Sequence, residues 1–175
     1  MSAACGEDDM HLFLTGEIQV GKSTAIKRFL RASGAVACGF RTFWDGGALK
    51  IAPYGAAPSA GETVALKGEK GLTVLPHAFD AASERLFDVP EGSDLMIMDE
   101  LGFLESEDPM FQRRVLDSLE LPITVLGVIK PAGNAFLDKV RAHPRVRTVL
   151  VTPGNREEVY QMLCKELGSA YGIRL

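Results

Sequence analysis

The sequence predicts an α/β fold, a mostly parallel β-sheet covered by helices. Short apolar runs alternate with longer amphipathic stretches along the 175 residues, which is typical of such sheets. A phosphate-binding pattern follows the first apolar run, and two acids, Asp99 and Glu100, end a later one. Apolar residues make up 46% of the chain, enough for one domain with a proper core.

The first part of the chain has the pattern strand, helix, strand. The run "HLFLT" at residues 11–15 predicts a buried strand, and residues 22–32 predict a helix that Gly34 ends. The segment "AVACGFRT" at residues 35–42 predicts a second strand. The side chains expected on the inner face of the helix are Ile26, Phe29 and Leu30.

The pattern changes in residues 43–75. "WDGGALKIA" predicts a pair of strands that turns near residues 45–47, and "TVALKGEKGLTVL" predicts another that turns near residues 68–71. We therefore expect this section to be an antiparallel extension of the sheet.

The second half returns to alternating elements. Its predicted strands lie in residues 94–100, 122–129 and 146–152, and its predicted helices in residues 78–87, 107–119, 135–143 and 155–167. The inner face of the second of these helices is expected to hold Phe111, Val115, Leu116 and Leu119. Nothing between these elements reads as a linker, so we expect a flexible tail at residues 1–10 and one domain at residues 11–175.

The charged residues of the chain indicate which classes of partner it can bind. The formal net charge is −4, which argues against a dedicated nucleic-acid binder. A basic cluster is more typical of a solvated face, although it also suits a nucleic acid or an acidic partner. Its members are Lys139, Arg141, His143, Arg145 and Arg147.

The cysteines and the apolar runs indicate the compartment. The 3 cysteines form no C-x-x-C pair, so neither a disulfide framework nor a zinc site is indicated. No apolar run approaches the roughly 20 residues of a membrane span, and the amino terminus lacks a basic leader segment. We expect a cytoplasmic protein without a membrane partner.

The stretch "TGEIQVGKST" fits the pattern G-x-x-x-x-G-K-[ST] between a predicted strand and a predicted helix. Backbone N–H groups of such a loop surround phosphate oxygens, and the helix directs its positive end at them. Lys22 is placed to reach the terminal phosphates, and Ser23 to offer its hydroxyl to Mg²⁺. The residues predicted to bind the nucleotide are Gly16, Glu17, Ile18, Gln19, Val20, Gly21, Lys22, Ser23 and Thr24.

The acids of "DLMIMDE" complete the predicted chemistry. Asp99 lies at the carboxyl end of a strand, where ligands bind in such sheets, and is the predicted second partner of Mg²⁺. Glu100 can orient and deprotonate a water for attack on the γ-phosphate. The pair favours hydrolysis over transfer to another acceptor, and Lys22 and Glu100 are the main predicted catalytic residues.

Four segments together resemble a known family. After the loop come "GFRT" at Gly39–Thr42, "DELGFLE" at Asp99–Glu105 and "VTPGNREEV" at Val151–Val159. This order and spacing resemble the small nucleoside-triphosphatase family that includes the cancer-related nucleoside-triphosphatase. The resemblance runs from His11 to about Leu167. It implies a RecA-like P-loop fold of three layers and slow, Mg²⁺-dependent hydrolysis of several nucleoside triphosphates (ATP, GTP, CTP, UTP).

The chain departs from the family pattern inside the loop. Ile18 and Gln19 stand where relatives commonly have proline and glycine, and Ser23 replaces threonine while keeping the hydroxyl. The section at residues 43–75 matches the family poorly beyond its glycines, so what it recognises is expected to differ.

Several other residues have both a functional and a structural interpretation. Arg41 is a catalytic candidate, because an arginine at the end of the second strand can stabilise charge on the γ-phosphate. Arg156 can contact the nucleotide or lie in solvent, and Glu105 can face the metal or solvent. Asn155 suits the N-cap of the last helix. Trp44 is expected to pack in the core rather than at a partner surface.

Two other functions remain open from sequence. A phosphotransferase would need an acceptor pocket and usually a basic lid, and no arginine-rich lid follows the "DE" strand. A nucleotide-dependent switch or partner-binding module would bind the nucleotide without catalysing a reaction. The base-reading motif [NT]-K-x-D is missing, since "GVIKPAGN" lacks its aspartate, and this argues against guanine specificity.

Overall fold

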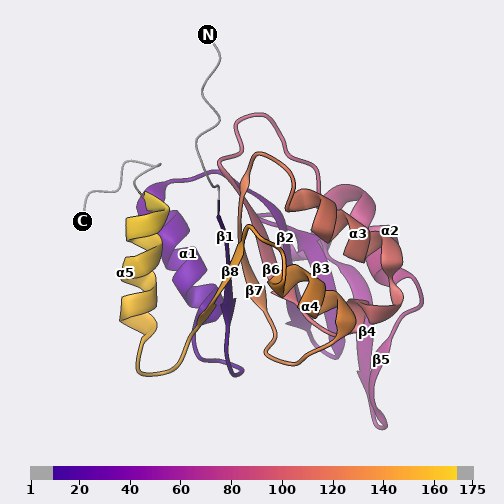
Figure 1. Cartoon of the computed structure of the whole chain (residues 1–175). Coiled ribbons are helices and arrows are strands. Elements are labelled where there is room, and N and C mark those ends of the chain that lie inside the picture. Colours follow the sequence, from indigo (N-terminus) through magenta and orange to yellow (C-terminus); the bar gives the residue numbers. More distant parts are fainter. Residues whose placement is uncertain (1–9, 169–175) are drawn as a thin grey trace.

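A computed structural model describes residues 10–168, and within them a single eight-stranded sheet forms the centre of the molecule (Figure 1). The strand order is β5-β4-β3-β2-β6-β7-β1-β8. The strands are β1 (His11–Thr15), β2 (Ala37–Asp45), β3 (Ala48–Pro53), β4 (Glu62–Gly68), β5 (Gly71–Val74), β6 (Leu95–Leu101), β7 (Thr124–Ile129) and β8 (Val146–Leu150). The helices are α1 (Lys22–Ser33), α2 (Ala78–Leu86), α3 (Pro109–Ser118), α4 (Ala135–Arg141) and α5 (Arg156–Glu166), with short 3-10 turns η1 (Pro58–Ala60) and η2 (Leu104–Glu107).

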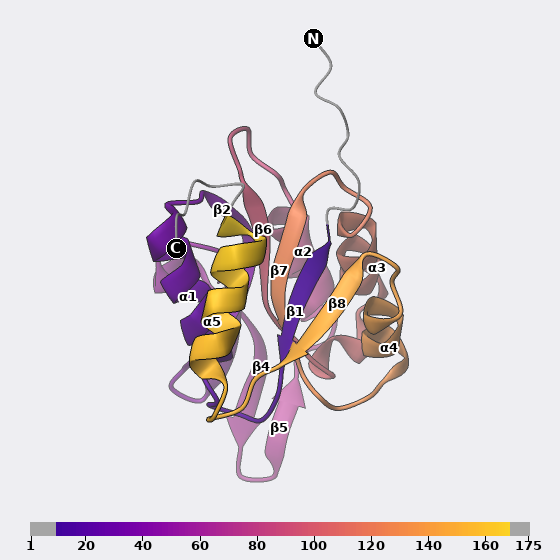
Figure 2. The same cartoon turned by 60° about the vertical axis from the view of Figure 1, so that its left-hand side comes forward.

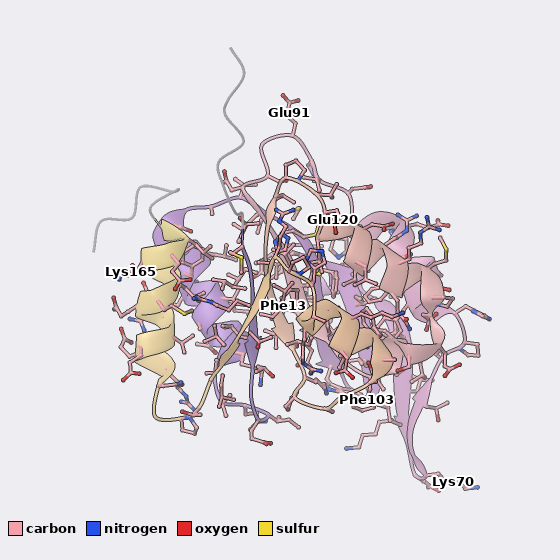
Figure 3. All side chains as sticks on the ribbon, in the orientation of Figure 1. Phe13, Lys70, Glu91, Phe103, Glu120 and Lys165 are labelled. Carbon is pink, nitrogen blue, oxygen red and sulfur yellow. The ribbon has the colours of Figure 1, made fainter. Side chains whose placement is uncertain are left out.

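The sheet has a parallel and an antiparallel part. Strands β2, β6, β7, β1 and β8 pair in parallel, whereas β3, β4 and β5 continue from β2 as antiparallel hairpins. The β4–β5 hairpin projects from the sheet, with Lys70 near its tip (Figure 3). The mostly parallel sheet with an antiparallel extension is therefore confirmed.

Helices cover both faces of the sheet. Helices α1 and α5 lie on one face, and α2, α3 and α4 lie on the other (Figures 1 and 2). Side chains of β6 alternate between the two cores: Met96 and Met98 pack with the second group of helices, and Leu95 and Ile97 with the first. Because the central strands are buried on both faces, they appear in the sequence as continuous apolar runs.

Strand order places the predicted site. Parallel strands end at the same edge of the sheet, so the loop after β1 and the acids of β6 come to one edge. Strand β7 lies between them. Strand β6 continues past Asp99 to Leu101, and its register against β7 shifts between these two residues.

One packing prediction is corrected. Trp44 is 52% exposed, so its expected place in the core is wrong; it lies near the end of β2, where the hairpin leaves the helix layers. Leu30 and Leu116 pack against the two cores as predicted, although they are only partly buried.

The predicted flexible tail falls almost entirely on residues 1–9, which lie outside the described residues, as do residues 169–175. Among residues 10–168, no helix is long and apolar enough to cross a membrane.

Candidate active site

The predicted phosphate-binding loop connects β1 to α1. Gly16 and Gly21 have positive φ angles, 135° and 102°. A Cβ on Gly16 would lie 2.3 Å from the carbonyl oxygen of Val151, so only glycine fits there. Figure 2 shows this loop beside the segment that leads from β8 into α5. The strand-loop-helix context predicted for the loop is confirmed.

Lys22 lies across the loop that carries it. Its Nζ donates to the carbonyl oxygens of Gly16 at 2.7 Å and Glu17 at 2.5 Å, and the residue is 9% exposed. Burial lowers the pKa of Lys22, and the carboxylates of Glu100 and Asp99 oppose that shift. The ammonium is therefore held close to both acids of β6.

Ser23 and Asp99 meet, although 76 positions separate them in the sequence. The Ser23 hydroxyl donates to Oδ1 of Asp99 at 3.0 Å. Burial raises the pKa of Asp99, while the hydrogen bond from Ser23 favours the charged form. A hydroxyl and a carboxylate are the oxygen donors that Mg²⁺ prefers, so this pair fits the predicted metal.

Glu100 forms an ion pair that the sequence did not suggest. Its Oε1 lies 3.2 Å from Nζ of Lys130, the residue directly after β7. The Thr42 hydroxyl accepts from the backbone N–H of Glu100 at 3.4 Å and contacts the carbonyl oxygen of Asp99 at 3.5 Å. Thr42, in the "GFRT" segment, thus holds the Asp99–Glu100 peptide in place.

The guanidinium of Arg41 makes two contacts within the fold. Its guanidinium donates to the carbonyl oxygen of Ala56 at 3.2 Å and lies 4.5 Å from the ring centroid of Phe43. These contacts account for the guanidinium without a phosphate, and its catalytic role stays a prediction.

A cavity of about 530 Å³ lies beside the loop, between α1 and α5. Arg156 borders it, and its Cδ and Nε lie 3.5 Å from where a Cβ on Gly21 would stand. The guanidinium of Arg28 lies 3.6 Å from the ring centroid of Tyr160 in the same wall. The residues lining the cavity are Gln19, Gly21, Thr24, Ala25, Arg28, Pro153, Gly154, Arg156, Glu157 and Tyr160.

Gln19 has a left-handed backbone, with φ 61°. This left-handed region favours glycine. The amide side chain of Gln19 adds a polar group to the wall of the cavity.

The predicted capping role of the Asn155 side chain is corrected. It stands at the N-cap position of α5, but its side chain makes no capping hydrogen bond. Its Oδ1 accepts instead from the N–H of Thr152 at 2.7 Å, and its Nδ2 donates to the carbonyl oxygen of Leu150 at 2.9 Å. Asn155 therefore shapes the turn that brings Arg156 to the loop.

The predicted basic cluster is largely occupied by contacts within the fold. Arg141 and Arg145 donate to backbone carbonyl oxygens, Arg147 pairs with Glu166, and His143 pairs with Glu120 at 2.8 Å. These contacts fit the interpretation as a solvated face.

Glu105 is buried, with 3% of its surface exposed, rather than in solvent. Both of its carboxylate oxygens accept from the N–H of Gly102, at 3.3 and 3.2 Å. Burial raises its pKa to about 7, in spite of these hydrogen bonds. The carboxyl thus ties together the loop that follows Glu100.

We expect the Glu105 carboxyl to make stability fall between about pH 4.5 and pH 7. Between its ordinary pKa of 4.5 and its folded pKa of about 7, the unfolded chain loses the proton while the folded protein keeps it. Relative to Glu105→Gln, the wild type should lose up to about 3 kcal/mol across this window and nothing further above it. Urea unfolding at several pH values measures this, with Glu107→Gln as an exposed control in the same turn. Parallel pH curves for the wild type and Glu105→Gln would contradict it.

Comparison with known proteins agrees with this geometry. A protein-family model described as NTPase matches residues 64–164, more than half of the chain. The chain belongs to this NTPase family. Its members bind and hydrolyse nucleoside triphosphates, and the match includes Asp99, Glu100 and Lys130.

Two solved structures of low sequence identity share the fold. THEP1 from the hyperthermophile Aquifex aeolicus has a TM-score of 0.74 at 19% identity, covering 94% of this chain and 100% of that one. A human cancer-related nucleoside triphosphatase has a TM-score of 0.72 at 22% identity, covering 92% of this chain and 98% of that one. The α/β P-loop fold is thereby confirmed. No curated protein sequence gives a significant match.

Proposed function

We propose that this member of the NTPase family hydrolyses nucleoside triphosphates to the diphosphate and phosphate, with Mg²⁺ and with little preference among bases. The observation that carries the proposal is the convergence of Lys22, Ser23, Asp99 and Glu100 from two distant segments at one sheet edge, with Ser23 and Asp99 3.0 Å apart.

Each residue has a distinct task. The loop amides and Lys22 bind the β- and γ-phosphates, and the hydroxyl of Ser23 and the carboxylate of Asp99 hold Mg²⁺. When bound, Mg²⁺ neutralises charge on the phosphate oxygens. Glu100 orients a water and accepts its proton as the water oxygen bonds to the γ-phosphorus. The bond from the γ-phosphorus to the bridging oxygen breaks, and the nucleoside diphosphate leaves.

The cavity between α1 and α5 is proposed as the site of the base and ribose. Arg156, Arg28 and Tyr160 in its wall offer cationic and aromatic surface, which contacts any base face without reading its edge. This supports ATP, GTP, CTP and UTP as substrates. A cytoplasmic location is proposed with it, because the cellular triphosphates are found there.

A smaller cleft beside Glu100 favours water as the acceptor. Its volume is about 80 Å³, and Thr42, Glu100, Phe103 and Lys130 are among the residues that line it. This cleft is large enough to hold water beside Glu100.

We expect phosphate release from all four triphosphates in the presence of Mg²⁺, and its loss with EDTA. The diphosphate should accumulate in equal amount, because water is the only other reactant. Lys22→Ala is the control for a contaminating phosphatase, since it removes the charge that binds the terminal phosphates. Transfer of label from [γ-³²P]ATP to a nucleoside or nucleoside monophosphate, without free phosphate, would replace hydrolysis by phosphotransfer.

A further inference from the structure

Lys130 belongs neither to the phosphate-binding pattern nor to the acidic pair of β6. It follows the last residue of β7, the strand between β1 and β6. The phosphate-binding loop follows β1, so Lys130 leaves the sheet between that loop and Glu100. Its Nζ lies 3.2 Å from Oε1 of Glu100. The Lys130 ammonium therefore stands beside Glu100, at the end of the site where the γ-phosphate is proposed to bind.

The side chain of Lys130 is directed by the loop after β6. Its Cδ and Cε lie 3.4 and 3.5 Å from where a Cβ on Gly102 would stand, and its Nζ lies 5.5 Å from the ring centroid of Phe103. The Glu105 carboxyl fixes Gly102 through the backbone N–H. The ammonium is thus aimed at Glu100 by packing and not only by charge.

A second cation beside Glu100 would offset the repulsion between this carboxylate and the γ-phosphate. The Glu100 carboxylate must lie near a water that attacks an anionic γ-phosphate, and like charges at short range repel. The guanidinium of Arg41 already contacts Ala56 and Phe43, and the ammonium of Lys22 donates to carbonyl oxygens of its own loop. An ammonium has three donors, so one group can bridge a carboxylate and a phosphate oxygen at once.

We propose that Lys130 is a γ-phosphate contact, bridging that phosphate and Glu100. The inference rests on the proposed function of the site and adds a residue that distinguishes triphosphates from diphosphates. Lys130 holds Glu100 beside the water and stabilises the charge that builds up on the γ-phosphate oxygens. A diphosphate has no group at this place, so its affinity does not depend on Lys130.

The test compares Lys130→Met, which keeps the length of the side chain without its charge, with Lys130→Arg. Binding of AMPPNP and of ADP is measured by isothermal titration calorimetry, which needs no probe near Lys130. For Lys130→Met we expect a loss of AMPPNP affinity of about tenfold or more with ADP affinity within twofold, and a fall in kcat of about 10²–10³-fold. Lys130→Arg should recover part of both losses. Lys139→Met, exposed on α4, is the matched control and should change neither.

Each result decides the assignment. Equal losses for AMPPNP and ADP, or unchanged kcat and affinities with wild-type hydrolysis intact, would overturn the role of Lys130 while the proposed function stands. Selective loss of AMPPNP binding in a protein that releases no phosphate would keep the Lys130 contact and refute hydrolysis. If Lys130→Met does not fold, as judged by circular dichroism, the Arg and Gln variants at this position carry the same comparison.

Discussion

Replacing Glu100 with glutamine is expected to lower kcat for phosphate release by about 10²–10⁴-fold, the range that one positioned general base contributes. Glutamine keeps the size of the side chain but cannot take a proton from water. Because Lys22, Ser23 and Asp99 are unchanged, affinity for AMPPNP and Mg²⁺ should stay close to the wild-type value. Single-turnover phosphate release with excess enzyme measures the chemical step without product release.

The matched control for this variant is Glu107→Gln, an exposed glutamate in the turn after β6. It changes the net charge equally and should leave kcat unchanged. A wild-type rate for Glu100→Gln would show that Glu100 is not the base. The losses for Glu100→Gln and Lys130→Met are expected to be less than additive when combined, because the two side chains contact each other at 3.2 Å.

The order and type of the main elements could be predicted because each is periodic over several residues. Residues 11–15 and 95–98 are buried on both faces and form continuous apolar runs, whereas α1 shows the spacing of Ile26 and Phe29. The ends of elements were less predictable. Strand β6 continues beyond Asp99 because Leu101 returns to the core, although two acids come between.

The loop and both acids could be predicted because their spacing is local. Lys130 could not, because its approach to Glu100 depends on β7 entering the sheet between β6 and β1. The available signal was a basic residue directly after the predicted strand at residues 122–129, together with two acids at the end of the predicted strand at residues 94–100. Contacts between the starts of distant helices could not be predicted from the sequence for the same reason. Asp80 accepts from the N–H of Phe111, and Asp108 accepts from the N–H of Asp80.

The "GFRT" segment, part of the family resemblance, is expected to act mainly through the fold. Gly39 has φ 94°, and a Cβ there would lie 2.0 Å from the carbonyl oxygen of Ile97 in β6. Phe40 is fully buried against the rings of Phe87 and Phe111. With Thr42 bonded to the Asp99–Glu100 peptide, the segment brings β2 tightly against the strand that carries the acids.

Gly39→Ala is therefore expected to destabilise the protein by about 3–5 kcal/mol, from the strain of a positive φ plus an overlap with backbone that cannot move aside. Gly34→Ala is the matched control. Gly34 also has a positive φ, 65°, but no atom lies within 4 Å of its added Cβ, so only the backbone strain of about 1–2 kcal/mol applies. Urea unfolding followed by far-ultraviolet circular dichroism gives both free energies. Equal losses would mean that the β2–β6 approach tolerates a methyl group. A larger loss for Gly39→Ala would show that the strand bearing Asp99 and Glu100 leaves no room for a side chain at this position.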